Sequence, residues 1–255
     1  MPIVNNDLFV AAALGHVPSA VVVYKFGRRD GIGLTLEDIA PAAAYAGFIP
    51  IADAATLSFI STSILDDIAS TGCQVLRISG LDENLDVQIR DYDTDGQVAV
   101  VTTGDLWSRV FRLRSRQADD RRAPNAGVIT VSSTASGTPV MATMPIGLGS
   151  SLTTNFTMPA GMRGVIAVVS AGMGNNKVGD IRLMISEIVA GENRPFDVEA
   201  NIPITAGPSD IRVSFVLEEK TDVIVSALAL AGTVDAFLSY RIYIETNGNV
   251  IGPVI

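Results

Sequence analysis

The sequence is poor in the residues that most enzymes use for acid–base and nucleophilic chemistry. Its 255 residues include a single histidine, His16, and a single cysteine, Cys73. One cysteine excludes an intrachain disulfide framework and is compatible with synthesis in a reducing cytosol. The sequence also has no Gly-x-Ser-x-Gly elbow, Walker A loop or His-Glu-x-x-His helix. We therefore expect a protein that is not an enzyme and carries no cofactor, with a turn or packing role for His16 and a small buried side chain at Cys73.

Charged and aromatic residues are also scarce. Charged residues make up 18% of the chain and aromatic residues 6%, whereas hydrophobic residues reach 48%. No apolar run approaches the roughly 18 residues that a membrane span needs. Residues 8–14 follow Asp7 without a basic stretch, which makes a poor signal peptide. The apolar excess therefore predicts burial against other protein subunits, because obligate interfaces resemble a protein core cut in half.

Basic residues are outnumbered, with 18 lysines and arginines against 27 aspartates and glutamates and a net charge of -9. Proteins that bind nucleic acids usually carry basic surface that neutralises phosphates. We therefore expect no nucleic-acid partner, and the short apolar runs predict no membrane partner.

Short runs rich in valine and isoleucine, bounded by Gly, Pro, Asn and Asp, indicate β-strands. The predicted strands span residues 20–26, 55–62, 74–79, 86–90, 97–102, 107–114, 127–132, 164–170, 181–189, 211–217, 223–230 and 238–246. Helix signals are weak: residues 10–14 could form a turn, and residues 35–46 could form a short helix that Pro41 interrupts. The fold class is predicted to be mainly β.

Residues 117–125 are polar and charged and include Pro124, as linkers often do. This composition predicts two β-rich modules. Residues 1–122 would form an N-terminal domain that docks onto a partner. Residues 123–255 would form a C-terminal β-sandwich resembling a jelly roll, because their strands recur every 10 to 15 residues between Gly, Pro and Asn turns.

Three aspartates at alternate positions, Asp91, Asp93 and Asp95, precede Gly96. This spacing reproduces the first half of a calcium-binding loop, in which the glycine permits a sharp turn. The twelfth position is Thr102 rather than a bidentate glutamate. The alternative is the tip of a β-hairpin with solvated carboxylates, which the Asp-Gly pair also indicates.

Six of the fifteen arginines lie between residues 109 and 122. On an extended strand, Arg112, Arg114 and Arg116 share one face. Because arginine pairs with carboxylates through two parallel hydrogen bonds, these three residues are predicted to dock an acidic neighbour. The alternative is a solvated strand face whose charge is balanced by Asp119 and Asp120.

Several short segments occur in an order that is typical of one family. They are Lys25-Phe26-Gly27-Arg28, Ser61-Thr62-Ser63, Asp66-Asp67, Thr71-Gly72-Cys73, Ile78-Ser79-Gly80-Leu81-Asp82, Met158-Pro159-Ala160-Gly161 and Glu219-Lys220-Thr221-Asp222. With these segments the chain resembles virion structural proteins of tailed bacteriophages, in particular capsid decoration (cement) proteins of marine podoviruses and siphoviruses. It departs from the family pattern at residues 93–96, where a shorter and less acidic turn is usual.

The resemblance implies a non-enzymatic component of a virus particle. As a head decoration protein, the chain would bridge neighbouring capsid subunits on the head surface after synthesis in the host cytoplasm. Its partners would be the major capsid protein and itself, as a homotrimer matched to local threefold axes. The alternative is a tail or baseplate component that binds a receptor, although one tryptophan, Trp107, offers little for stacking sugars. A depolymerase or lysin is disfavoured, because adjacent carboxylates on a strand point to opposite faces.

Overall fold

The computed structural model describes residues 12, 16–17, 20–40, 53–137, 139–174, 177–189, 192–205 and 208–246. This part of the chain is almost entirely β, which confirms the predicted fold class, and every predicted strand overlaps an observed one. The strands are β1 (Ala20–Ile32), β2 (Glu37–Asp38), β3 (Leu57–Ser61), β4 (Val75–Leu81), β5 (Val87–Asp93), β6 (Val100–Val101), β7 (Arg109–Arg116), β8 (Ile129–Ser133), β9 (Val140–Met144), β10 (Phe156–Thr157), β11 (Met162–Met173), β12 (Gly179–Val189), β13 (Glu192–Asn193), β14 (Asp197–Ile204), β15 (Ser209–Leu217), β16 (Thr221–Ala229) and β17 (Val234–Thr246).

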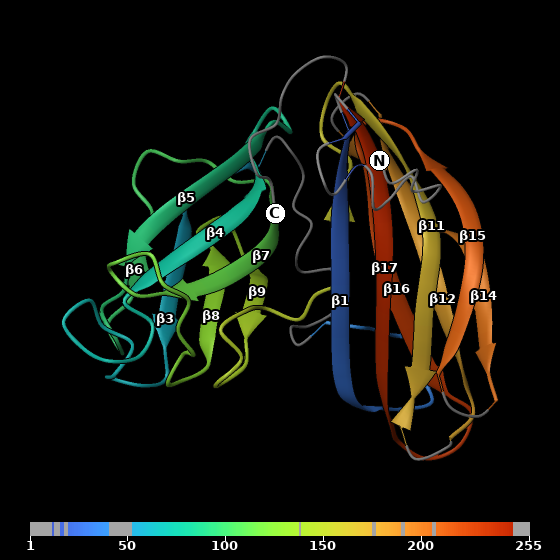
Figure 1. Ribbon diagram of the computed structural model, residues 1–255, viewed down its shortest axis with the longest axis horizontal. Coiled ribbons are helices and arrows are strands. Elements are labelled where there is room, and N and C mark those ends of the chain that lie inside the picture. Colours follow the sequence, from blue (N-terminus) through green and yellow to red (C-terminus); the bar gives the residue numbers. More distant parts are fainter. Residues whose placement is uncertain are drawn as a thin grey trace, which may run out of the picture.

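Two antiparallel sheets form a sandwich, which lies on the right in Figure 1. One sheet has the order β1-β17-β11-β15. In the other sheet, β16 pairs with β12 on one side and with the two short strands β2 and β10 on its other side. Strand β14 pairs with the side of β12 that faces away from β16. The short strand β13 also pairs with β12, next to the start of β14. If β2 and β10 count as one position, and β13 and β14 as another, the eight positions in chain order fall as 1-8-3-6 in one sheet and 2-7-4-5 in the other. This is the strand order of a jelly roll, so the predicted sandwich is confirmed.

A second β module lies beside the sandwich, on the left in Figure 1. It consists of a sheet of order β6-β3-β8-β9 and a sheet of order β5-β4-β7. All of these strands fall between β2 and β10 in the chain, so we call them the inserted module.

Strand pairing therefore groups the residues differently from the predicted division between residues 122 and 123. The first strand, β1, pairs with the last, β17, and so belongs to the sandwich. Strands β8 and β9 follow residue 122 but pair with β3 and with each other in the inserted module. The polar segment 117–125 is a connection within that module, because local composition marks a surface segment and does not reveal which remote strands pair.

Two further local predictions are wrong. Glu37 and Asp38, in the predicted helix over residues 35–46, form a short strand on β16, and residues 41–46 lie outside the described residues. The strands on either side of Asp95-Gly96 do not form a hairpin with each other, because β5 pairs with β4 and β6 pairs with β3. The turn at Gly96, with φ of +54°, instead connects two sheets.

Of the predicted turn at residues 10–14, only Ala12 is described. The described helical residues include no helix long and apolar enough to cross a membrane.

The two modules share an apolar interface. Phe111 of β7 belongs to the same hydrophobic cluster as the sandwich core, together with Leu81 and Leu85 of the inserted module. The rings of Phe111 and Phe156 of β10 lie 4.8 Å apart between centroids. A separate cluster around Trp107, Leu76 and Leu113 fills the inserted module. Each module thus has its own core, and the apolar interface between the modules is continuous with the core of the sandwich.

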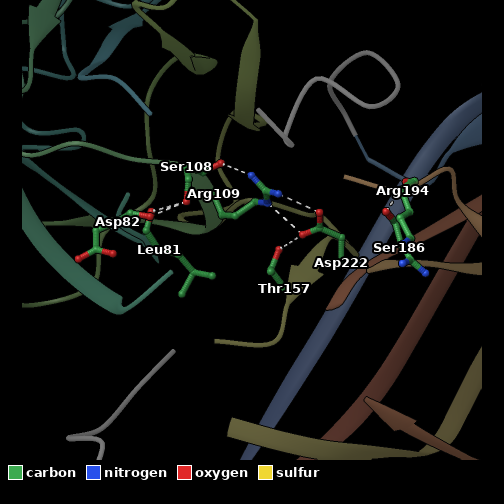
Figure 2. Close-up of polar contacts among 8 residues, drawn as sticks. All are labelled: Leu81, Asp82, Ser108, Arg109, Thr157, Ser186, Arg194 and Asp222. Atoms are coloured by element: carbon green, nitrogen blue, oxygen red, sulfur yellow. Dashed lines mark hydrogen bonds and ion pairs between the residues drawn. The ribbon is translucent and has the colours of Figure 1, made fainter. Parts of the chain in front are cut away.

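A buried ion pair also joins the modules (Figure 2). Arg109 Nε and Nη2 of β7 donate to the two carboxylate oxygens of Asp222 of β16, at 2.9 and 2.8 Å. Both side chains are at most 1% exposed, and the Thr157 hydroxyl donates to the same carboxylate. A carboxylate that accepts a fork of hydrogen bonds from arginine fixes both position and angle, so this pair sets the orientation of β7 against β16.

A buried lysine makes a third connection. Lys25 Nζ of β1 donates to the backbone oxygen of Phe111 at 2.7 Å. That oxygen is available because β7 has a bulge at Phe111, where Arg112 pairs with Ser79 and Val110 pairs with Gly80. Burial lowers the pKa of Lys25 well below its usual range, and the charge of Arg112 lowers it further.

Lys25 should make stability depend on pH on the alkaline side. The unfolded chain holds the Lys25 proton up to its ordinary pKa of 10.5, whereas the folded protein releases it at lower pH. Unfolding therefore takes up a proton between the two pKa values, and the free energy of unfolding rises with pH in that window, by up to about 1.4 kcal/mol per pH unit. Denaturation of the wild type and of Lys25→Met at several pH values from 7 to 10 checks this. The variant should lose the rise; equal slopes in the two proteins would contradict it.

Candidate anion-binding pocket

The arginine-rich strand β7 alternates as its sequence predicts. Leu113 and Ser115 are at most 1% exposed, whereas Arg112, Arg114 and Arg116 on the other face are half-buried. The extended conformation thus places the three predicted docking arginines in one row.

Two loops close a pocket around part of this row. The pocket has a volume of about 430 Å³ and is lined by Arg112, Arg114, Arg122, Ala123, Pro124, Gly147, Leu148, Gly149 and Ser150. Arg122 is placed there by a β-bridge to Arg116, and the 147–150 loop by a β-bridge between Arg114 and Ser150. Gly149 has a φ of +63°, and a Cβ there would lie 2.9 Å from the Ala123 oxygen. A glycine is therefore needed for the two loops to meet.

The charge in this pocket is not balanced from within the described part of the chain. No carboxylate there lies within 4.0 Å of Arg112, Arg114 or Arg122. Burial, followed by repulsion from Arg112 and Arg122, lowers the pKa of Arg114 to about 10. Burial and repulsion from Arg122 likewise lower the pKa of Arg112. The folded protein therefore holds three like charges close together. Arg112 and Arg114 are partly buried and Arg122 is exposed, and the repulsion raises the free energy of the folded protein.

Arg116 has a different environment from its two neighbours. It forms an ion pair with Asp120, four residues along the chain. Arg121, next to the pocket residue Arg122, pairs with Asp119 at 2.6 Å. The two alternatives predicted for these arginines therefore apply to different residues. Arg116 fits a solvated face whose charge Asp120 balances, whereas Arg112 and Arg114 fit the prediction of a docking site. Arg122 lies outside β7 and reaches the pocket only because the chain folds back there. The sequence showed that Arg122 belongs to the arginine-rich segment but not that it lies beside Arg112 and Arg114.

The three aspartates of the predicted calcium loop do not converge. Asp91 and Asp93 lie on β5, and Asp95 lies beyond its end in a bridge to Asp67. Arg77 Nε donates to the carboxylate of Asp91 at 2.6 Å, and this hydrogen bond is the main cause of the lowered pKa of Asp91. Among the residues that the structure describes, no three acidic, histidine or cysteine side chains form a group that could hold a metal. The geometry gives the calcium hypothesis no support.

The single histidine, His16, and the single cysteine, Cys73, have opposite environments. His16 is exposed. Cys73 is fully buried, and burial raises the pKa of its thiol to about 11. A thiol with so high a pKa is a poor nucleophile at neutral pH. The arrangement of Cys73 agrees with the predicted small buried residue.

No protein-family model matches the chain, and no curated protein matches it. Among solved structures, it is similar to infectious bursal disease virus Gt strain at 10% identity and a TM-score of 0.29, covering 95% of this chain and 79% of the other. A VP2 protein of the same virus, in derived T=1 particles, gives 11% identity and a TM-score of 0.28, with 97% and 77% covered. The clostridial cysteine protease Cwp84 gives 9% identity and a TM-score of 0.23, with 75% and 71% covered. Such scores carry no assignment, and the jelly-roll order rests on the strand pairing of this chain itself.

Proposed function

We propose that this chain is a non-enzymatic structural subunit of a bacteriophage particle, and specifically a head decoration protein that bridges neighbouring capsid subunits. The observation that carries the proposal is a jelly-roll sandwich with an inserted β module fixed to it by the buried pair of Arg109 and Asp222. Jelly rolls build virus capsids but also lectins and other proteins, so the fold alone does not assign the function. The sequence resemblance to virion structural proteins is what favours a role in a virus particle over the other functions of this fold.

The surface of the sandwich supports a place in an assembly. The β1-β17-β11-β15 sheet exposes large apolar side chains on its outer face, including Tyr24 (48% exposed), Phe26 (45%) and Val216 (60%). We infer that partners cover these side chains, because burial of apolar surface is the main favourable contribution to most protein association. The proposed partners are the major capsid protein and further copies of this chain in a homotrimer.

Copy number in purified particles tests this proposal. Quantitative mass spectrometry against the major capsid protein should give hundreds of copies for a head protein and a dozen or fewer for the alternative, a tail or baseplate component. Particles that lack the chain should also release their genome at lower temperature than complete ones. Absence of the chain from purified particles would overturn the structural role, and equal thermal stability of the two particle types would overturn the decoration role.

A further inference from the structure

The pocket lined by Arg112, Arg114 and Arg122 has the features of a binding site whose ligand supplies the missing negative charge. We propose that it binds carboxylate side chains of an acidic segment from a neighbouring protein. The anion chemistry follows from the pocket alone, whereas the placing of that neighbour in a virus particle rests on the proposed function.

The pocket destabilises the folded protein as long as its arginines lack a negatively charged partner. The chain has nine more acidic than basic residues, so carboxylates to neutralise the cluster are plentiful. Asp119 and Asp120 are close in sequence, yet they pair with Arg121 and Arg116 and leave the pocket arginines unbalanced. Local arrangements that work against stability are expected at functional sites, where a partner compensates for them.

The lining of the pocket has the chemistry to bind carboxylates. A guanidinium group binds a carboxylate or a phosphate through two parallel hydrogen bonds, and several such groups around one hollow bind more than one anionic group. The remaining lining includes Ala123, Pro124 and Leu148, which suit the methylene groups of acidic side chains. The pocket can therefore hold both the charged end and the apolar stem of an aspartate or glutamate.

The pocket adjoins two further hollows on the surface. A second hollow of about 310 Å³ shares Arg122, Ala123 and Pro124 with the pocket. A third hollow of about 500 Å³ shares Leu148 and reaches Arg28, Arg29 and Asp30 of the sandwich. Its arginines are already paired, Arg28 with Asp30 and Arg29 with Glu37, so this hollow adds room but no unbalanced charge. The three hollows adjoin, so the depression accommodates a peptide segment and not only a single small anion.

The charge of the whole chain favours a protein over a nucleic acid. With a net charge of -9, the surface outside the pocket repels a long polyanion, whose binding needs many phosphate contacts. A short acidic segment brings few charges and places them in the pocket. The observations therefore favour an acidic protein segment, and phosphate binding becomes an outcome of the test.

Fluorescence anisotropy of the purified full chain with labelled hexaglutamate tests the proposal. The variant is Arg112→Gln/Arg114→Gln, and the matched control is Arg163→Gln. Arg163 is an exposed arginine on β11 of the sandwich that pairs with Glu245. The wild type and the control should bind hexaglutamate in a salt-dependent manner. The double variant should bind at least about ten-fold more weakly, because two charge-assisted contacts are removed. Its melting temperature should not fall, since mutually repelling charges are removed, and this shows that the variant is folded.

Several results would overturn the proposal. They are equal binding of labelled hexaglutamine, equal loss of binding in the Arg163→Gln control, and no binding of hexaglutamate by the wild type. A single-stranded oligonucleotide that binds more tightly than hexaglutamate, and depends on Arg112 and Arg114, would replace the carboxylate by phosphate. The binding experiment needs no particles, whereas the proposed function is tested by copy number in particles. Each can therefore fail while the other holds.

Discussion

Arg109→Met is expected to lower the free energy of unfolding by about 3–5 kcal/mol, because the change leaves the carboxylate of Asp222 buried without its cation. Asp222 is 0% exposed, so water cannot replace the lost partner. The Thr157 hydroxyl, which also donates to Asp222, offsets only part of the missing charge. The pair also lies at the contact between the two modules, next to their apolar contacts and the hydrogen bond of Lys25.

Urea denaturation followed by the fluorescence of the buried Trp107 and by circular dichroism measures this effect. The double variant Arg109→Met/Asp222→Leu should recover most of the lost stability, since a buried pair can often be replaced by apolar residues at little cost. Arg163→Met is the control, because Arg163 and Glu245 form an exposed pair that contributes at most about 1 kcal/mol. If Arg109→Met cost no more than Arg163→Met, the ion pair would not fix the modules.

Asp66→Ala is expected to cost about 3–5 kcal/mol as well, for a different reason. Asp66 is 0% exposed, and its carboxylate accepts hydrogen bonds from four donors, two of which lie about 60 residues further along the chain. Oδ1 accepts from the backbone N–H groups of Cys73 and Ala126, both at 2.7 Å. Oδ2 accepts from the Ser61 hydroxyl at 2.6 Å and from the Gly127 N–H at 2.8 Å. Removing the carboxylate deprives three backbone N–H groups of their acceptor, each at a cost of about 1–3 kcal/mol.

The neighbouring aspartate is a matched control for this prediction. Asp67 is partly exposed, and its carboxylate accepts from the Ala69 N–H at 2.8 Å in a turn open to solvent. Asp67→Ala should therefore cost less than about 1 kcal/mol in the same denaturation experiment. Asp66→Asn should fall between the two, because an amide keeps one acceptor oxygen and brings two donors. A similar cost for Asp66→Ala and Asp67→Ala would show that the carboxylate of Asp66 does not hold these segments together.

Local patterns in the sequence predicted most of the longer strands. The valine-rich and isoleucine-rich runs predicted strands that the structure contains, although short or polar strands such as β2, β10 and β14 were missed. The alternation along β7 predicted that Arg112, Arg114 and Arg116 share a face, because side chains alternate on any extended strand. The spacing of turns in the second half predicted a sandwich.

The sequence by itself determined the β class, the strand positions and the row of arginines, since these follow from the period of side chains along an extended chain. Only the tertiary structure decided which strands pair, so it alone brought β1 beside β17 and placed β3 to β9 in a module beside the sandwich. It also decided the fate of each charge: Arg109 meets Asp222 across 113 residues, Asp91 meets Arg77, and Arg112 and Arg114 meet no carboxylate among the described residues. The reason is physical: remote strands pair through backbone hydrogen bonds and side-chain packing, and charges find partners across the folded chain. Neither is encoded within a single local window.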